Sequence, residues 1–159
     1  MSSEIRYGNV AGPGSGREYR VAADQYVSRK GGKFVQLVAG DVTLCASGAT
    51  QIAGWAETPK DADGYNAWKS SATARADKVF VISAECNTFE LPCNEANATL
   101  TASYIGCGCG IVNSGTTYTL VQKAKLGAVT ASPLTIVDVD TVNNTVRVKV
   151  KAKAIQSIG

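Results

Sequence analysis

The fold is predicted most directly by one stretch, KFVQLVAGDVTLCASGATQIAGWAE, which spans residues 33–57. Short runs rich in Val, Leu, Ile and Phe are separated there by Ala39-Gly40-Asp41, by Ser47-Gly48-Ala49 and by Gly54. Runs of this length and β-branched content favour strands, whereas Gly and Asp favour the turns between them. We therefore expect three strands joined by turns. Gly54 has no Cβ, so another strand or the indole of Trp55 could approach it closely.

Similar short runs predict strands along the rest of the chain. The predicted strands span residues 19–27, 79–83, 88–91, 98–104, 116–121, 134–139 and 145–153. The last two form the clearest hairpin, and a basic link is expected at 123–127. With no sustained helical period, about ten strands predict a single all-β domain over residues 19–159, built from short antiparallel strands as a small barrel, sandwich or β-tulip.

Residues 1–18 predict a flexible N-terminal arm, because they are polar and rich in glycine. The segment GPGSG, residues 12–16, matches neither a dinucleotide-binding fingerprint nor a P-loop. The arm is either a mobile terminus or a segment that becomes ordered on a partner surface. For the second case, Arg6 and Tyr7 are candidate partner contacts.

Composition excludes several classes of function. The chain has 159 residues, of which 45% are hydrophobic and 18% charged, with a net charge of +3 and no histidine. Histidine-based triads, acid–base groups and metal sites are therefore excluded. No apolar run approaches the roughly 20 residues of a membrane-spanning helix, and we expect no membrane partner. The N-terminus has no signal-peptide pattern, which predicts synthesis and retention in a cytoplasm. The mild net charge does not indicate a nucleic-acid partner.

The cysteines leave three alternatives open. Cys86, Cys93, Cys107 and Cys109 lie within 24 residues, in the spacing C-x6-C-x13-C-x-C. Structural zinc sites use paired C-x2-C units, which this chain lacks. We rank reduced, packed thiols first, a disulfide second and a metal third, and expect no metal or other cofactor. A catalytic cysteine ranks last because no histidine could activate it.

The final predicted strand separates charge from apolar surface. Its apolar face carries Val146, Val148, Val150 and Ala152. Its cationic face carries Arg147, Lys149, Lys151 and Lys153. Since residues on one face of a strand recur about every 6.6 Å, the four cations would form one line. That line is either a solvated face that discourages edge pairing or a docking stripe for an acidic surface.

A tryptophan stands out in the polar excursion at residues 58–78. Trp68 either plugs the core of the domain or faces a partner, because a large amphipathic ring is suited to both places. We therefore include it among the candidate partner contacts.

Several motifs, taken together, resemble those of a known family. In chain order they are Gly40-Asp41-Val42, Gln51-Ile52-Ala53-Gly54-Trp55-Ala56, Ala102-Ser103-Tyr104-Ile105-Gly106, Cys109-Gly110-Ile111, Ile136-Val137-Asp138-Val139-Asp140, Asn143-Asn144 and Val146-Arg147-Val148. The pattern resembles the small head decoration (cement) proteins of tailed bacteriophages over about residues 19–153. The cysteine cluster and the excursion at 58–78 depart from the family pattern.

The resemblance implies a structural role. Head decoration proteins are all-β, often homotrimeric, and sit on the outer capsid surface near threefold or quasi-threefold positions. They bridge neighbouring major capsid subunits and resist the pressure of packaged DNA, with no catalytic residues. We therefore expect a non-enzymatic virion protein, made in the host cytoplasm, whose partner is the major capsid protein.

Two other classes of function remain as alternatives. A carbohydrate- or receptor-binding β-module of a virion surface would need an exposed aromatic platform, for which Tyr65 with Trp68 is the candidate. An enzyme that uses carboxylates alone could draw on Asp138 with Asp140, or on Glu85 with Glu90. Nothing in the sequence places either carboxylate pair around a cleft.

Overall fold

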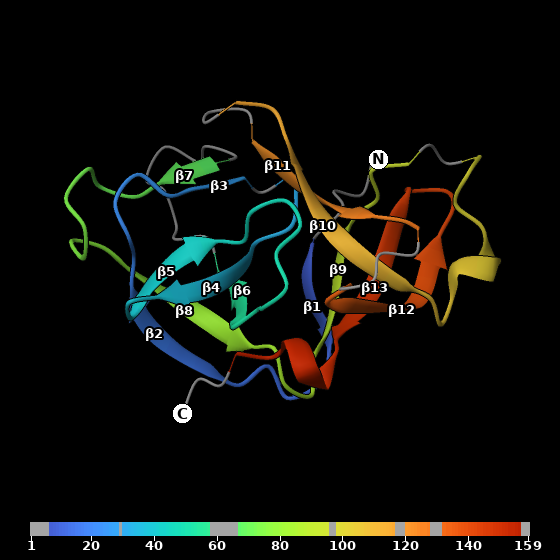
Figure 1. The fold of residues 1–159 in the computed structure, drawn as a ribbon, viewed down its shortest axis with the longest axis horizontal. Coiled ribbons are helices and arrows are strands. Elements are labelled where there is room, and N and C mark those ends of the chain that lie inside the picture. Colours follow the sequence, from blue (N-terminus) through green and yellow to red (C-terminus); the bar gives the residue numbers. More distant parts are fainter. Residues whose placement is uncertain are drawn as a thin grey trace, which may run out of the picture.

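The computed structural model describes residues 7–28, 30–57, 67–95, 98–116, 120–127 and 132–156. Within these ranges the chain is all-β, with antiparallel sheets that pack together as a sandwich (Figure 1). The predicted fold class is confirmed. The described residues contain no helix with the length and apolar character that crossing a membrane requires.

The larger sheet has six strands in the described part of the chain. In spatial order they are β1 (Gly8–Ala11), β9 (Thr88–Pro92), β13 (Thr145–Val150), β12 (Leu134–Asp140), β10 (Gly108–Ser114) and β11 (Val121–Lys125). The sheet curls, so that strands far apart in its order approach each other: Cys93, just after β9, forms an isolated bridge with Ala124 of β11, the edge strand on the other side. The predicted C-terminal hairpin is confirmed as β12–β13, with a register shift between Ile136 and Asp138 that marks a bulge.

The second sheet has five strands in the same described part. Their spatial order is β2 (Gly16–Arg20), β8 (Lys78–Ser83), β6 (Gly54–Ala56), β4 (Phe34–Val38) and β5 (Asp41–Leu44). This sheet also curls, and Val21 after β2 forms a parallel bridge with Val42 of β5. β3 (Tyr26–Ser28) pairs separately with β7 (Ala67–Lys69). The five-stranded sheet occupies the left half of Figure 1 and the six-stranded sheet the right half.

The three strands expected in residues 33–57 are present as β4, β5 and β6. Their order differs from a simple meander, since β4 lies in the middle and pairs with both β5 and β6. Gly54 allows the close approach that the sequence predicted: a Cβ on this residue would lie 2.0 Å from the carbonyl oxygen of Ile82 in β8. A larger residue at this position would push β6 away from β8.

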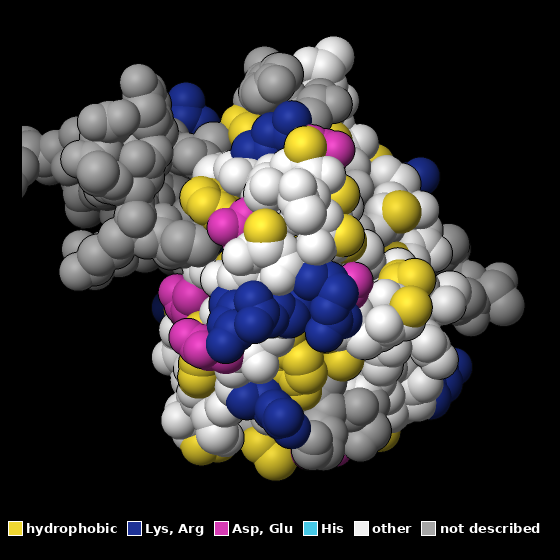
Figure 2. Space-filling view, turned by 90° about the vertical axis from the view of Figure 1, so that its left-hand side faces the viewer, with side chains coloured by type: hydrophobic (Ala, Val, Ile, Leu, Met, Phe, Trp, Pro, Cys, Tyr) yellow, Lys and Arg dark blue, Asp and Glu magenta, His cyan; other side chains and the backbone are white. Residues whose placement is uncertain are grey.

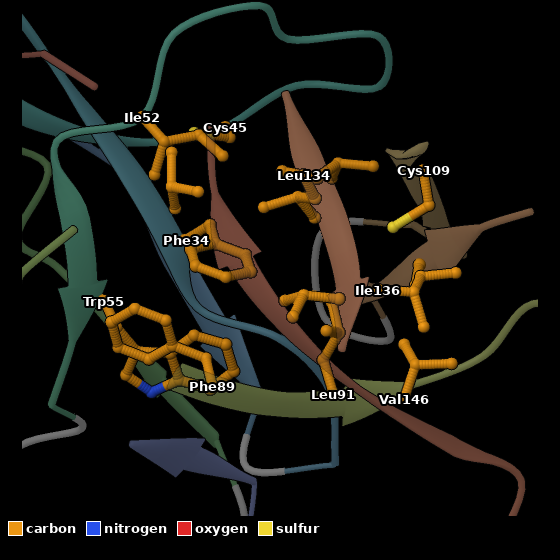
Figure 3. Close-up of a cluster of buried hydrophobic side chains, with 14 of the residues drawn as sticks. Phe34, Cys45, Ile52, Trp55, Phe89, Leu91, Cys109, Leu134, Ile136 and Val146 are labelled. Carbon is orange, nitrogen blue, oxygen red and sulfur yellow. The ribbon is translucent and has the colours of Figure 1, made fainter. Parts of the chain in front are cut away.

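Three aromatic rings join the two sheets. Trp55 and Phe34 belong to the five-stranded sheet and Phe89 to the six-stranded one, and all three are fully buried. The Trp55 ring stacks on Phe89 with centroids 5.6 Å apart, and Phe34 meets Trp55 edge-on at 4.9 Å. Figure 3 shows the aliphatic side chains of β9, β12 and β13 continuing this cluster away from the rings. Burial of such rings is the largest apolar contribution to a core of this size.

A buried amide also links the sheets. Gln122 of β11 is 1% exposed, and its side chain accepts a hydrogen bond from the Phe34 N–H (2.8 Å) and donates to the Phe34 carbonyl (3.1 Å). The amide thereby pairs with β4 as a neighbouring strand would, so its polar atoms are satisfied inside the core. A second, smaller apolar cluster lies within the five-stranded sheet and contains Val21, Val35, Val42, Ala56, Val79 and Val81.

The prediction that residues 1–18 form an arm without regular structure is wrong for residues 7–18, the part that the structure describes. Residues 1–6 lie outside the described residues, but β1 pairs with β9 and β2 with β8. The glycines suit these strands, since a Cβ on Gly16 would lie 1.9 Å from the Val81 carbonyl oxygen. Glycine therefore marks close strand packing here rather than a linker, and the predicted boundary after residue 18 falls inside β2.

Other predicted elements also change. Residues 102–104 form a short 3-10 helix, η1, where a strand was expected, and the basic link at 123–127 is mostly strand β11. The expected strand at 19–27 is divided between β2 and β3 by a turn in which Asp24 has φ +55°. Of the strand expected at 116–121, residues 117–119 lie outside the described residues.

Candidate functional site

The cationic strand predicted at 145–153 is broken. β13 ends at Val150, and η2 (Ala152–Ala154) turns the chain. Arg147 and Lys149 are exposed on the outer face of β13, whereas Lys151 is half-buried after the strand and Lys153 lies in η2. The prediction of four cations in one line is therefore wrong.

The break has two physical causes. The partner strand β12 starts after Pro133, which has no N–H to extend the hydrogen-bond ladder. Beyond η2 the chain is held by the other sheet, where Ile155 bridges to Ile52. The Gln156 amide also accepts from the Leu37 N–H (2.7 Å) and donates to its carbonyl (2.8 Å). These contacts draw the C-terminal segment away from the direction of β13.

Arg147, one of the two exposed cations of β13, has acidic partners. Arg147 Nε lies 3.2 Å from Glu90 Oε1, and Asp138 lies opposite Arg147 in the strand register. With Asp140, these side chains line a polar hollow of about 310 Å³. The charge of Arg147 is thus largely matched within the molecule, which weakens its attraction for an outside acid.

The hollow gathers the carboxylates of the alternative enzyme hypothesis. Asp140, however, has a lowered pKa, first because the Asn143 backbone N–H donates to it and next because the Asn143 side-chain amide does. A glycosidase needs one carboxylic acid whose pKa is raised. Glu85 lies apart, exposed in the turn between β8 and β9. No observation in the described residues favours carboxylate catalysis.

The other candidate contacts differ in exposure. Arg6 lies outside the described residues, as does Tyr65. Tyr7 is half-buried against the large core, and its pKa is raised by burial and then by the charge of Glu90. Trp68 is half-buried in β7, packs against the smaller cluster and stands opposite Val27 in the register. Trp68 therefore contributes to the domain's own packing.

No disulfide joins the cysteines, all of which are described. Cys93 and Cys109 are buried in the large core, as predicted for packed thiols, and so is Cys45. Burial raises the pKa of both the Cys45 and the Cys109 thiol to about 12. Cys86 and Cys107 are exposed, so the prediction that they pack in the core is wrong.

A second cationic surface, missed in the sequence, lies on the five-stranded sheet. Arg20 of β2 and Lys78 of β8 stand directly opposite each other in the register, and both are exposed. The Arg20 guanidinium donates to the Arg75 carbonyl at 3.1 Å, which brings a third cation beside them. We call Arg20, Arg75 and Lys78 the cationic face. Figure 2 shows Lys and Arg side chains forming a band across the middle of this side of the molecule, with apolar side chains below.

The charges of the cationic face are only partly matched. Arg75 forms an ion pair with Asp41. Arg20 and Lys78 form no ion pair with any described residue, and Glu18 is the nearest carboxylate along the same strand face, opposite Phe80. Like charges directly opposite each other on neighbouring strands are destabilising. Beside them on the same face lies the aromatic ring of Phe80, which is 39% exposed. Unmatched cations beside an exposed ring have the chemistry of a surface that binds an acidic partner.

The sequence contains only part of the signal for this face. The run Lys78-Val79-Phe80-Val81 alternates as an exposed strand would, and Arg17 to Arg20 is rich in charge. The tertiary fold, however, decides that these two segments pair, and it sets the register that places Arg20 opposite Lys78. Arg75 reaches the face because its loop docks on the end of β2, through the Arg75 N–H and the Val21 carbonyl (2.9 Å).

Within the described ranges, no group of three or more metal-binding side chains is placed to hold a metal ion. Searches against protein-family models, curated proteins and solved structures found no match to this chain.

Proposed function

We propose that this protein is a structural virion protein that binds the outer surface of a phage capsid and stabilises it by bridging neighbouring major capsid subunits. The strand-and-glycine motifs that resemble head decoration proteins support this role. The all-β sandwich is compatible with it. In the proposed arrangement the protein is a homotrimer at threefold or quasi-threefold positions, and its role requires no catalytic residue.

The observation that carries the proposal is the opposition of Arg20 and Lys78 on an exposed strand pair. Such a pair costs about 0.2–1 kcal/mol of stability relative to a neutral one. An acidic partner surface would remove that repulsion and add attraction, so the cost is recovered on binding. The partner chemistry proposed for the cationic face is therefore an acidic patch on the major capsid protein.

The energy of each contact is small, but the arrangement multiplies it. An exposed ion pair contributes about 0.2–1 kcal/mol and is screened by salt. In a trimer on a fixed lattice each contact occurs three times, and the second and third are intramolecular. Attachment can thus be firm even though each cationic face binds weakly.

The carbohydrate-binding alternative receives less support. It needs an exposed aromatic platform, and Trp68 packs against the smaller cluster instead. Tyr65 lies outside the described residues. We keep this alternative second.

The proposal is tested by electron microscopy of particles from the source that encodes this chain. Particles with the gene should show density for a sandwich of this size on the outer shell near threefold or quasi-threefold positions, and particles without it should lack that density. Density confined to the tail, or particles identical in the two preparations, would contradict the proposal.

A further inference from the structure

The turn between β12 and β13 presents one apolar side chain to solvent. Val142 is 83% exposed, the largest exposure among the large hydrophobic residues described. The turn is held tightly around it, because the Asp140 carboxylate accepts hydrogen bonds from the Val142 and Asn143 N–H groups (both 3.0 Å) and from the Asn143 side chain (2.8 Å). Little conformational entropy would be lost when such a side chain is buried by a partner.

The end of the same turn is fastened to the neighbouring strand. Asn144 has φ +55°, and its side-chain amide donates to the carbonyls of Cys93 (3.3 Å) and Glu95 (2.6 Å). Its own carbonyl accepts from the Cys93 N–H at 2.9 Å. Val142 is thus held on a rigid turn. We call Val142 together with this turn, residues 141–144, the knob. Beside the knob, Asp138, Asp140 and Glu90 outnumber Arg147, so the surroundings of the knob carry a net negative charge.

A matching depression lies where β10 and β11 of the same sheet meet the loop that joins β5 to β6 of the other sheet. It has a volume of about 160 Å³ and a mainly apolar lining that includes Ala49, Ile111, Val112 and Pro133, and we call it the hole. Because a water molecule takes about 30 Å³ of liquid volume, the hole has room for several waters that an aliphatic side chain would displace. Lys125 also lines it and forms no ion pair with a described residue.

The knob and the hole sit at opposite ends of β12. Pro133, in the hole, directly precedes the strand, and the knob directly follows it. The seven residues of β12 span about 20 Å at 3.3 Å per step. One molecule therefore cannot place its own knob in its own hole, whereas a second copy can.

We propose that copies of this chain associate head to tail, with Val142 of one copy inserted in the hole of the next and Asp138 and Asp140 facing Lys125. Both halves of the contact agree in chemistry: an apolar side chain flanked by acids meets an apolar depression flanked by a cation. The contact joins two different patches, so it is heterologous, and repeated rotation closes it into a ring or extends it as a filament. A ring of three would suit the proposed capsid role, but the contact itself needs no capsid.

The experiment uses the purified full chain and sedimentation velocity over a range of concentrations. Val142→Asp removes the knob and leaves the hole intact, whereas Ala49→Phe fills the hole and leaves the knob intact. Val38→Asn is the control, because Val38 is also exposed (52%) but lies on the other sheet, and an uncharged residue adds no like charge opposite Asp41. Melting curves identify any variant that has lost its fold, and Lys125→Glu then replaces Ala49→Phe as the hole variant.

Wild type and Val38→Asn should form species larger than a dimer, either a closed ring or a filament that grows with concentration. Each single knob or hole variant should raise the dissociation constant at least about tenfold, since one aliphatic side chain is no longer buried. A mixture of Val142→Asp and Ala49→Phe retains one working contact per pair, so it should form dimers and nothing larger. A wild type that stays monomeric up to about 1 mM would overturn the inference, as would knob and hole variants that assemble like wild type. Both results are independent of whether a capsid is the partner.

Discussion

The two cationic surfaces of this molecule are built in different ways. On β13, Arg147 and Lys149 lie on the same exposed face of one strand, and Arg147 forms an ion pair with Glu90. On the cationic face, Arg20 and Lys78 come from segments far apart in the sequence and oppose each other without a carboxylate partner in the described residues. The pattern along a strand therefore shows which side chains are exposed, but strand pairing decides which charges stay unmatched. Unmatched charge is the property that favours an acidic partner.

The two surfaces depend on one shared junction, which gives the largest expected effect. Trp55→Ala removes the ring that stacks on Phe89 and should lower the free energy of unfolding by about 3–5 kcal/mol. Because the cavity opens between the sheets, both surfaces should lose their structure together. Denaturant unfolding followed by two probes measures this, with exposed Val38→Ala as a control near wild type. A loss below about 1 kcal/mol would show that the junction is not shared.

A charge reversal on β13 should destabilise the fold. Arg147→Glu breaks the contact with Glu90, whose side chain is only 15% exposed, and places a third carboxylate near Glu90 and Asp138. We expect a loss of about 1 kcal/mol in the free energy of unfolding, because a matched pair becomes a repulsive one. Equilibrium unfolding at low and high salt checks this, and the loss should shrink as salt rises. An unchanged stability would mean that Arg147 is not matched in solution.

The corresponding reversal on the cationic face should have the opposite sign. Lys78→Glu converts a repulsive pair into an attractive one with Arg20, and we expect a gain of about 0.2–1 kcal/mol in the free energy of unfolding. Glu18 lies diagonal to residue 78, at the larger separation of about 7–8 Å, and reduces the gain without reversing it. Thermal melts of wild type, Lys78→Glu and Lys78→Gln compare the attractive, repulsive and neutral cases. A destabilised Lys78→Glu protein would contradict the account.

The smallest expected effect is on stability at low pH, and it also distinguishes the surface at β13 from the cationic face. The Asp140 pKa is lowered from 3.8 in the folded protein, so its contribution to stability is present above that value and is lost as the pH falls through the folded pKa. Asp140→Asn should therefore flatten the dependence of stability on pH below about 4, while Lys78→Gln leaves it unchanged. Unfolding curves from pH 7 down to about 2 test this, and an unchanged acid slope in Asp140→Asn would contradict it.

The sequence predicted the elements whose signal is local. The β12–β13 hairpin and the strands β4, β5 and β6 follow from alternation, turn residues and β-branched content over a few neighbouring positions. The glycine-rich N-terminal segment was misread because its glycines serve close packing against β8, which is distant in sequence. The same limit applies to Gln122: only the fold reveals that its amide pairs with Phe34 in the other sheet. Residues whose role comes from a distant partner could not be predicted, and the cationic face consists of such residues.

The central claim is that the cationic face, rather than β13, attaches the protein to an acidic capsid surface. The direct measurement is occupancy on capsids against salt concentration for wild type, for Arg20→Glu with Lys78→Glu, and for the charge-matched control Lys149→Glu with Lys153→Glu. The first double variant keeps two like charges opposite each other, but it places both beside Glu18 and removes the Arg20 hydrogen bond to the Arg75 carbonyl, so a melting curve first establishes that it is folded at the assay temperature. We predict at least about a tenfold loss of occupancy for this variant at low salt, a smaller loss at high salt, and near-wild-type occupancy for the control. Equal occupancy of the two variants, or a larger loss in the control, would contradict the account.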